Sequence, residues 1–188
     1  MSDAQIMGPR WLDEDEQRTW VAFLFASRML LSLVERDLQH DSQLPFTHYE
    51  ILVVLSEVEG RSLRMSELAE SMQISRSRLS QAVARLEASG WVRRETWAAD
   101  RRGAVAVLTD AGHAVLVAAA PRHVESVRRH LFDQLTPEQL ADLRSVSETL
   151  LRHLIPALGM TPADLMPGPL LELLAQAHPE CAEELLAR

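Results

Sequence analysis

The feature that most restricts the fold is a change of hydrophobic period at Gly90. Between Ser75 and Gly90 the apolar residues recur at helical spacing, with Ser75 as a candidate N-cap and Gly90 as a glycine suited to end a helix. After Gly90 the period becomes two. Residues 91–97 alternate large and polar side chains, and residues 105–109 form a second β-rich run. The sequence therefore predicts a helix followed directly by a β-hairpin.

A shorter helix is predicted immediately before this one. Ser66 is its candidate N-cap, it runs through Ser71, and a tight turn at residues 72–74 separates it from Ser75. Two helices joined by such a turn form the helix-turn-helix pattern. Together with the hairpin they predict a winged helix-turn-helix, in a chain that is mostly α with a small β-hairpin wing.

The N-terminal helix, expected from Asp13 to Gln39, is apolar on most of its faces. Trp20 and Leu38 belong to one helical stripe, whereas Phe23 and Met29 lie on other faces. A helix of this kind is normally buried on most sides. Because a chain of 188 residues cannot easily surround it, a second subunit is expected to cover it.

Two further helices are predicted on either side of the winged motif. The first covers about 47–58, with Thr47 as its N-cap and Glu50 at the spacing of a capping box. The second begins at residue 109 or 110 and continues to about Phe132. Pro121 lies inside it and is expected to kink the helix or split it in two.

The last long helix has a clear start signal at Thr136. Thr136 is a candidate N-cap, Pro137 suits the first helical position, and Gln139 completes the capping box. This helix is expected to end near Pro156, and two or three short amphipathic helices are expected in the tail beyond it.

Charge separates the middle of the chain from its flanks. The net charge is −8 and the sequence pI about 5.4, which by themselves argue against nucleic acid. All 19 basic residues are arginine, however, and nine of them lie between residues 61 and 102, against five acidic residues there. A basic block between acidic flanks is typical of a module that binds a polyanion. A solvated basic face is the alternative.

The helix from Ser75 presents two different faces. Leu79, Val83 and Leu86 share a narrow sector that is expected to face the core. The opposite side carries small and polar residues with arginines at its edge, as a helix that reads the major groove requires. Arginine in the first turn opposes the helix dipole, which suggests an external anion. The residues expected to contact DNA are Ser75, Arg76, Ser77, Arg78, Gln81, Arg85, Arg94, Arg101 and Arg102. Alternatively, the arginines of this helix pair with surface carboxylates such as Glu70 or Glu87.

The tip of the predicted hairpin carries a second arginine cluster. Arg101 and Arg102 could enter the narrow minor groove, where the potential is most negative. Phosphate would repel Asp100 beside them, so its expected role is to anchor an arginine of the wing, such as Arg94. The alternative is an ordinary solvated hairpin end.

With these motifs, residues 15–155 resemble the MarR family of bacterial transcription regulators. The likeness is carried by residues 65–69, 74–77, 85–92, 100–102 and 107–112, and Asp100-Arg101-Arg102 followed by Leu108-Thr109 and Gly112 is its most distinctive part. The resemblance implies a triangular homodimer with two winged domains that bind a pseudo-palindromic operator. It also implies a possible ligand pocket between the dimerisation helices and the winged domain.

The resemblance divides the chain into four parts. Residues 10–45 would be an N-terminal dimerisation helix, 46–110 the DNA-binding domain, 111–158 the C-terminal dimerisation helices, and 159–188 an extra helical tail. Candidate pocket residues for an aromatic acid are Trp11, Trp20, His48, Tyr49 and Arg64, which combine apolar walls with a cation and hydrogen-bonding groups. Plain packing at the dimer interface is the alternative for each of them.

Other classes of function have little support in the sequence. No metal site or cofactor is expected, because the seven histidines follow no ligand spacing and Cys181 is the only cysteine. No catalytic constellation appears, so we expect no enzyme. Without a signal peptide or an apolar run of ~20 residues, the expected location is the cytoplasm.

These observations predict a homodimeric regulator that binds double-stranded DNA. We expect a repressor that responds to a small aromatic or carboxylate effector. A winged-helix module that binds another protein instead of DNA is the alternative. An apolar outward face on the helix from Ser75 would have favoured that module.

Overall fold

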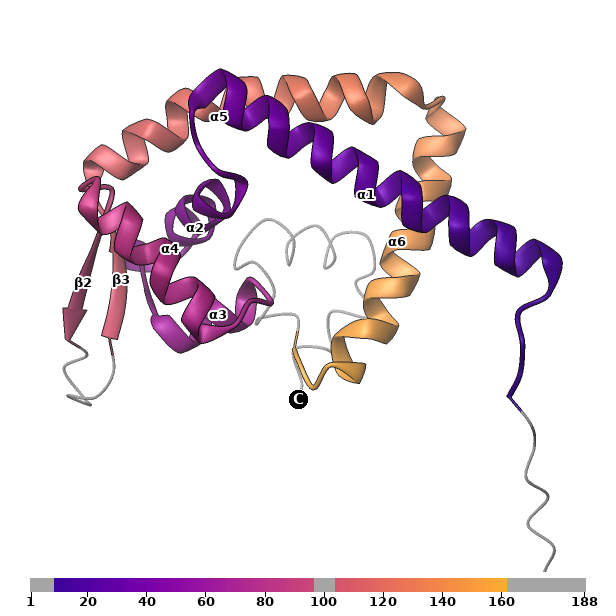
Figure 1. The fold of residues 1–188 in the computed structure, drawn as a ribbon, viewed down its shortest axis with the longest axis horizontal. Coiled ribbons are helices and arrows are strands. Elements are labelled where there is room, and N and C mark those ends of the chain that lie inside the picture. The colour runs from indigo at the N-terminus through magenta and orange to yellow at the C-terminus, as the bar shows by residue number, and fades with distance from the viewer. Residues whose placement is uncertain (1–8, 97–103, 162–188) are drawn as a thin grey trace, which may run out of the picture.

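A computed structural model describes residues 9–96 and 104–161 of the chain. Its six α-helices are α1 (Glu14–Ser42), α2 (Phe46–Glu57), α3 (Met65–Ser71), α4 (Arg76–Ala88), α5 (Asp110–His130) and α6 (Pro137–Ala157). The strands are β1 (Ser62–Arg64), β2 (Val92–Thr96) and β3 (Ala104–Leu108), and short 3-10 turns cover Glu59–Arg61 and Phe132–Gln134. Figure 1 shows the long helices α1 and α5 lying together on one side, with α2–α4 and the strands at one end. The predicted class, mostly α with a small β wing, is confirmed.

The sheet has one strand more than the hairpin predicted from the sequence. Its order is β1-β3-β2, and both pairings are antiparallel. Val92 pairs with Leu108 in the hairpin, and Ser62 pairs with Val107 on the other edge of β3. Three residues of β1 are too few to show a period of two, so only the pairing with β3 reveals the strand.

The core of the winged domain lies between α2, α3, α4 and the sheet. Leu79, Val83 and Leu86 of α4 have no exposed surface, as the helical period predicted. Leu68 of α3 and Leu52 of α2 are equally buried and belong to the same cluster. This packing holds one face of α4 inside and leaves its opposite face in solvent.

Two predicted caps of α4 are confirmed. The hydroxyl of Ser75 accepts a hydrogen bond from the backbone N–H of Arg78 at 3.2 Å. Gly90 follows the helix with φ of 73°, a left-handed conformation that glycine adopts without strain.

The predicted starts of α2 and α3 were wrong. Thr47 is not the N-cap of α2, because the helix begins one residue earlier, at Phe46, and Pro45 supplies the first carbonyl acceptor to the N–H of Tyr49. Ser66 lies inside α3, whose N-cap is Arg64. The backbone of residue 64 is extended because it ends β1, so the helix starts as soon as the strand stops.

Pro121 does not split α5. The helix is continuous from Asp110 to His130, with Thr109 as its N-cap, and it changes direction along its length (Figure 1). At the next helix, the predicted capping box of Thr136 and Gln139 is present, with Pro137 at the first position.

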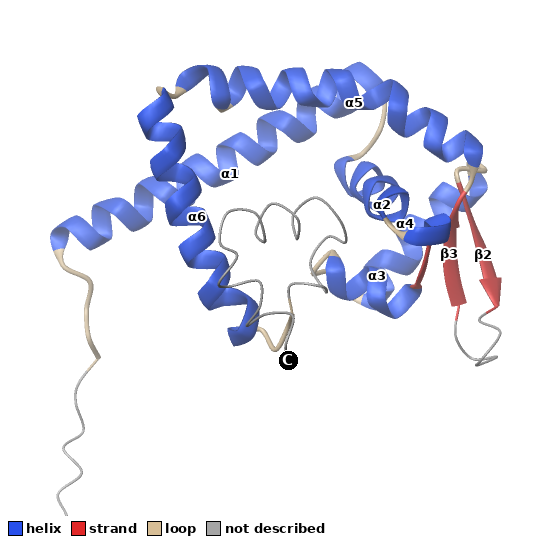
Figure 2. Ribbon diagram, turned by 180° about the vertical axis from the view of Figure 1, so that it is seen from behind, coloured by secondary structure: helices blue, strands red, loops and turns tan. Residues whose placement is uncertain are grey.

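The N-terminal half of α1 is not covered by the rest of the subunit. Val34 and Leu38, near its C-terminal end, are buried. By contrast, Trp20, Phe25 and Met29 expose 52%, 53% and 63% of their surface. Figure 2, seen from behind, shows this half of α1 extending away from the winged domain. The helix therefore leaves a large apolar face exposed.

A close backbone contact joins the winged domain to α5. A Cβ placed on Gly112 would lie 2.1 Å from the carbonyl oxygen of Trp91. The hydroxyl of Thr109 accepts from Gly112 N–H at 3.0 Å and lies 2.7 Å from the carbonyl oxygen of Gly90, to which it donates. The turn that follows α4 is thus pressed directly against the first turn of α5.

We expect Gly112→Ala to lower the free energy of unfolding by about 1–3 kcal/mol, as overpacking does. Helix propensity alone predicts the opposite sign, because alanine is favoured over glycine in a helix by about 1 kcal/mol. Urea denaturation measures the difference, with Ala114→Gly on the exposed side of α5 as the control for propensity. An unchanged or higher urea midpoint for Gly112→Ala would show that the contact between Gly112 and the carbonyl of Trp91 can accommodate a methyl group.

Candidate nucleic-acid interface

The candidate reading face is the exposed side of α4. The structure places six predicted contact residues on it or at its N-cap: Ser75, Arg76, Ser77, Arg78, Gln81 and Arg85, all exposed. Ala84 and Ala88 lie on the same side and are also exposed. Small side chains let a helix approach base edges closely, and Arg and Gln side chains match the major-groove edges of guanine and adenine.

The arginines of α4 differ in how far protein carboxylates neutralise them. Arg76 Nη2 lies 3.9 Å from Glu70 Oε1, and both side chains are largely exposed, so this pair is weak. Within the described part of the chain, Arg78 and Arg85 have no carboxylate within ion-pair distance. These two guanidinium groups are therefore the most available to an external anion.

Arg94 differs from Arg78 and Arg85, because a carboxylate of the protein pairs with it. It lies on β2, and its guanidinium bonds the carboxylate of Glu87 on α4, with Nη2 2.7 Å from Oε2. Arg94, one of the residues expected to contact DNA, is therefore paired with a carboxylate of the protein itself. Asp100, Arg101 and Arg102 lie outside the described residues. The strands that lead to them, β2 and β3, project from the body beside α4 (Figure 1).

The five candidate pocket residues do not form one cluster within the subunit. Tyr49 is buried and His48 half-buried on α2, and Arg64 is exposed before α3. Trp11 and Trp20 are exposed near the N-terminal end of α1. Trp20 precedes the end of α1 at Ser42 by about 33 Å of helix. Only a second subunit could bring these tryptophans to a pocket with the other three.

One neighbour of Tyr49 was missed as a site residue. His123 of α5 packs on Tyr49, with ring centroids 4.6 Å apart, and on Phe46 at 6.2 Å. Burial lowers the pKa of His123 and raises that of Tyr49. Burial, with the Arg85 charge as a smaller cause, also lowers the pKa of His48. No local pattern around residue 123 pointed to this contact, because it joins residues that are 74 positions apart.

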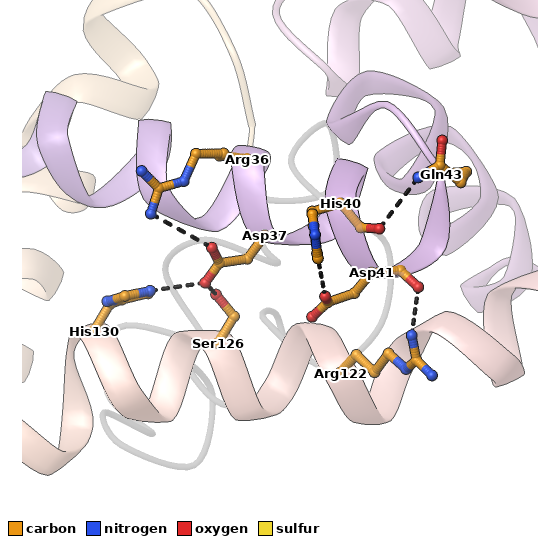
Figure 3. Close-up of polar contacts among 8 residues, drawn as sticks. All are labelled: Arg36, Asp37, His40, Asp41, Gln43, Arg122, Ser126 and His130. Carbon is orange, nitrogen blue, oxygen red and sulfur yellow. Dashed lines mark hydrogen bonds and ion pairs between the residues drawn. The ribbon is translucent and has the colours of Figure 1, made fainter.

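Polar contacts tie α1 to α5 (Figure 3). Oδ2 of Asp37 accepts a hydrogen bond from the hydroxyl of Ser126 at 2.9 Å and lies 2.8 Å from Nε2 of His130. The hydrogen bond with His130 is the main cause that lowers the pKa of Asp37. Arg122 donates to the backbone carbonyl of Asp41 in the same row. Since α5 also packs on the turn after α4, these contacts connect α1 with the reading face.

The described residues contain neither a candidate metal centre nor a helix suited to cross a membrane. They contain no group of three or more His, Cys, Asp or Glu side chains placed to hold a metal ion. None of the described helices combines the length and apolar character that crossing a membrane requires.

Comparison with known proteins agrees with this geometry. The sequence model of the MarR family matches residues 42–103, which include α2–α4 and β2. The structure of Sco3205, a MarR family transcriptional regulator from Streptomyces coelicolor crystallised in complex with DNA, matches with a TM-score of 0.72 and 44% identity. The match covers 86% of this chain and 98% of Sco3205. The chain belongs to the MarR family of transcriptional regulators.

Two other relatives agree with this assignment to the MarR family. AbsC, a MarR family regulator also from Streptomyces coelicolor, has a TM-score of 0.71 and 45% identity over 78% of this chain and 98% of its own. The curated regulator PecS of Dickeya dadantii is 31% identical over 90 residues, or 48% of this chain. The chain spans only 54% of PecS in that match.

Proposed function

We propose that this MarR-family protein is a homodimeric repressor that binds a pseudo-palindromic DNA operator. The observation that carries the proposal is the exposed polar face of α4, which combines Arg78, Gln81 and Arg85 with small side chains beside a projecting hairpin. The similarity of the chain to Sco3205, which was crystallised in complex with DNA, supports the proposed DNA binding. The outward face is polar, which disfavours a module that binds protein through an apolar α4.

The proposed dimer follows from the uncovered apolar surface. Residues 10–45 and 111–158 would form its interface, and residues 46–110 would form each DNA-binding domain. Dimeric helix-turn-helix proteins place their two reading helices in half-sites about 34 Å apart, so two-fold symmetry in the protein matches pseudo-palindromy in the operator. The role of residues 159–188 lies outside this proposal.

A small effector would act most directly between α2 and α5. Tyr49, His48 and His123 supply rings and polar atoms there, and both helices connect to the reading face. We propose an aromatic or carboxylate compound as the effector. A thermal-shift screen of phenolic and carboxylate compounds, followed by release of DNA in a gel shift, tests this part separately from DNA binding.

Replacing Arg78 or Gln81 by alanine is expected to cost about 1–3 kcal/mol of operator binding and to relax sequence choice at one position in each half-site. The reason is that both side chains project from the exposed face of α4, where base edges would lie. Gel shifts on the DNA upstream of the protein's own gene, with single-base variants of the bound site, measure both effects. Arg144→Ala, an exposed arginine on α6, is the matched control.

The same experiment separates DNA binding from the alternative role. If the wild-type protein binds no DNA in this region or in a pool of random duplexes, the proposed function is wrong and a protein partner is favoured. If binding survives in Arg78→Ala and Gln81→Ala with unchanged sequence preference, DNA is bound by another face.

A further inference from the structure

The ion pair between Glu87 and Arg94 connects the reading helix to the wing. Glu87 lies in the last turn of α4, and Arg94 lies on β2. Oε1 of Glu87 accepts from the backbone N–H of Arg94 at 3.2 Å, and Oε2 accepts from its Nε at 2.8 Å and lies 2.7 Å from Nη2. One carboxylate therefore holds both the backbone and the side chain of the same strand residue.

This contact differs from the other ion pairs near α4. The side chains of Glu87 and Arg94 are only 37% and 34% exposed, whereas those of Glu70 and Arg76 are 62% and 80% exposed. The hydrogen bonds from Arg94 hold the pKa of Glu87 below its usual range, so the carboxylate is charged at neutral pH. Planar Arg–carboxylate pairs with several parallel contacts fix orientation as well as charge.

The connection between α4 and β2 is otherwise short and local. Gly90 N–H bonds the carbonyl of Glu87 at 2.9 Å and Trp91 N–H bonds that of Leu86 at 2.9 Å, and these contacts end the helix. They set the direction in which β2 begins. Beyond Trp91, and within the described part of the chain, the contact between Glu87 and Arg94 is a polar tie from α4 to a residue inside β2.

We propose that Glu87 is a positioning residue for DNA binding, acting through Arg94 to hold the wing at a fixed place relative to the reading face of α4. This inference rests on the proposed function, because it concerns how the two DNA-contacting parts are aligned. Arg94 then serves as the ion-pair partner of Glu87 and does not bind a DNA phosphate. If the wing were displaced relative to α4, it would lose its contacts with the DNA groove even when α4 is bound in the major groove.

Simple electrostatics makes the opposite prediction. Glu87 brings a negative charge close to where the DNA backbone would lie, so its removal should strengthen binding if the residue were only a solvated carboxylate. Removal of Glu87 should strengthen DNA binding further if it released Arg94 to contact phosphate. A positioning role predicts weaker binding on removal of that negative charge.

The test uses the full-length dimer and the operator found by gel shift. We expect Glu87→Gln to bind about 10-fold more weakly, the order expected for loss of a charge-assisted hydrogen bond. Hydroxyl-radical footprints should lose protection at the outer flanks, where the wing would lie. Methylation protection of major-groove guanines, which α4 would cover, should persist. Thermal unfolding of the free protein shows whether the variant is folded.

Three further variants complete the design. Glu70→Gln removes a carboxylate from the weak pair with Arg76 and is expected to bind equally or more tightly. Arg94→Ala should weaken binding to a similar extent as Glu87→Gln without lowering the salt slope by about one, which loss of a phosphate contact would do. The exchange Glu87→Arg with Arg94→Glu should restore part of the flank protection.

The outcomes separate this inference from the proposed function. If the wild type binds no DNA, both are overturned. If the wild type binds and Glu87→Gln binds as well or better, or loses major-groove and flank protection together, the positioning role alone is overturned. Additive effects of Glu87→Gln and Arg94→Ala in the double variant would also overturn it, because residues acting through one contact are not additive.

Discussion

Raising the salt concentration from 50 to 200 mM is expected to weaken operator binding by about 10³-fold, although the protein has a sequence pI of about 5.4. The reason is counterion release from DNA, which depends on the local arginines that meet phosphate and not on the net charge. Fluorescence anisotropy with a labelled operator measures the slope of log K against log salt.

The structure favours the lower end of the range expected for ~6–10 phosphate contacts, about 10³ to 10⁵. Of the seven described arginines between residues 61 and 96, five have a carboxylate within ion-pair distance: Arg61, Arg64, Arg76, Arg93 and Arg94. Arg78 and Arg85 do not. Because Arg78 is expected to read a base, Arg85 and the proposed wing residues Arg101 and Arg102 would supply about six phosphate contacts in a dimer. Arg144→Ala should leave the slope unchanged. A flat salt profile would show that this basic block is not the binding face.

Leu154→Glu is expected to convert the dimer to a monomer at micromolar concentration and to abolish operator binding with it. Leu154 is 46% exposed on α6, in a row of apolar side chains that the subunit leaves uncovered. The row also contains Leu143, Val146, Leu150 and Leu158. A carboxylate buried in an apolar interface without a partner costs several kcal/mol, and a two-fold interface contains it twice.

Light scattering and sedimentation velocity test this expectation. The wild type should be a stable dimer, because an obligate interface of this kind buries upward of ~2,000 Å². Ser145→Glu, on the opposite side of α6, is the matched control and should remain dimeric. A wild-type monomer at micromolar concentration would contradict the proposed dimer, and a dimeric Leu154→Glu would place the interface elsewhere.

Local sequence signals determined the ends of α4 and its exposed face. Ser75 and Gly90 act within one turn of the helix ends, and the spacing of Leu79, Val83 and Leu86 identifies the buried side without any knowledge of its partners. The polar opposite face follows from the same period. The hairpin was also predictable, because large and polar side chains alternate after Gly90 and both strands contain β-branched residues, although burial does not alternate along β2 or β3.

The contacts that align these parts were decided only by the tertiary structure. Pairing with β3 makes a strand of residues 62–64 and so moves the start of α3 to Met65. Helix α5 is also continuous through Pro121, where the sequence had left a kink or a break open. No sequence pattern assigned Arg94 to Glu87, because any arginine of the basic block could have taken any nearby carboxylate.

The distance along the chain between interacting residues explains why some contacts could be predicted from the sequence and others could not. Caps and periodicity depend on residues a few positions apart, and the sequence displays them directly. His123 on Tyr49 and Ser126 on Asp37 instead join segments more than 70 residues apart in the chain, and each pairing exists only after α5 has packed against α1 and α2. The sequence by itself thus determined which residues of α4 face outward, where we propose that DNA is read, whereas the tertiary structure decided how that face is held relative to β2, α1 and α5.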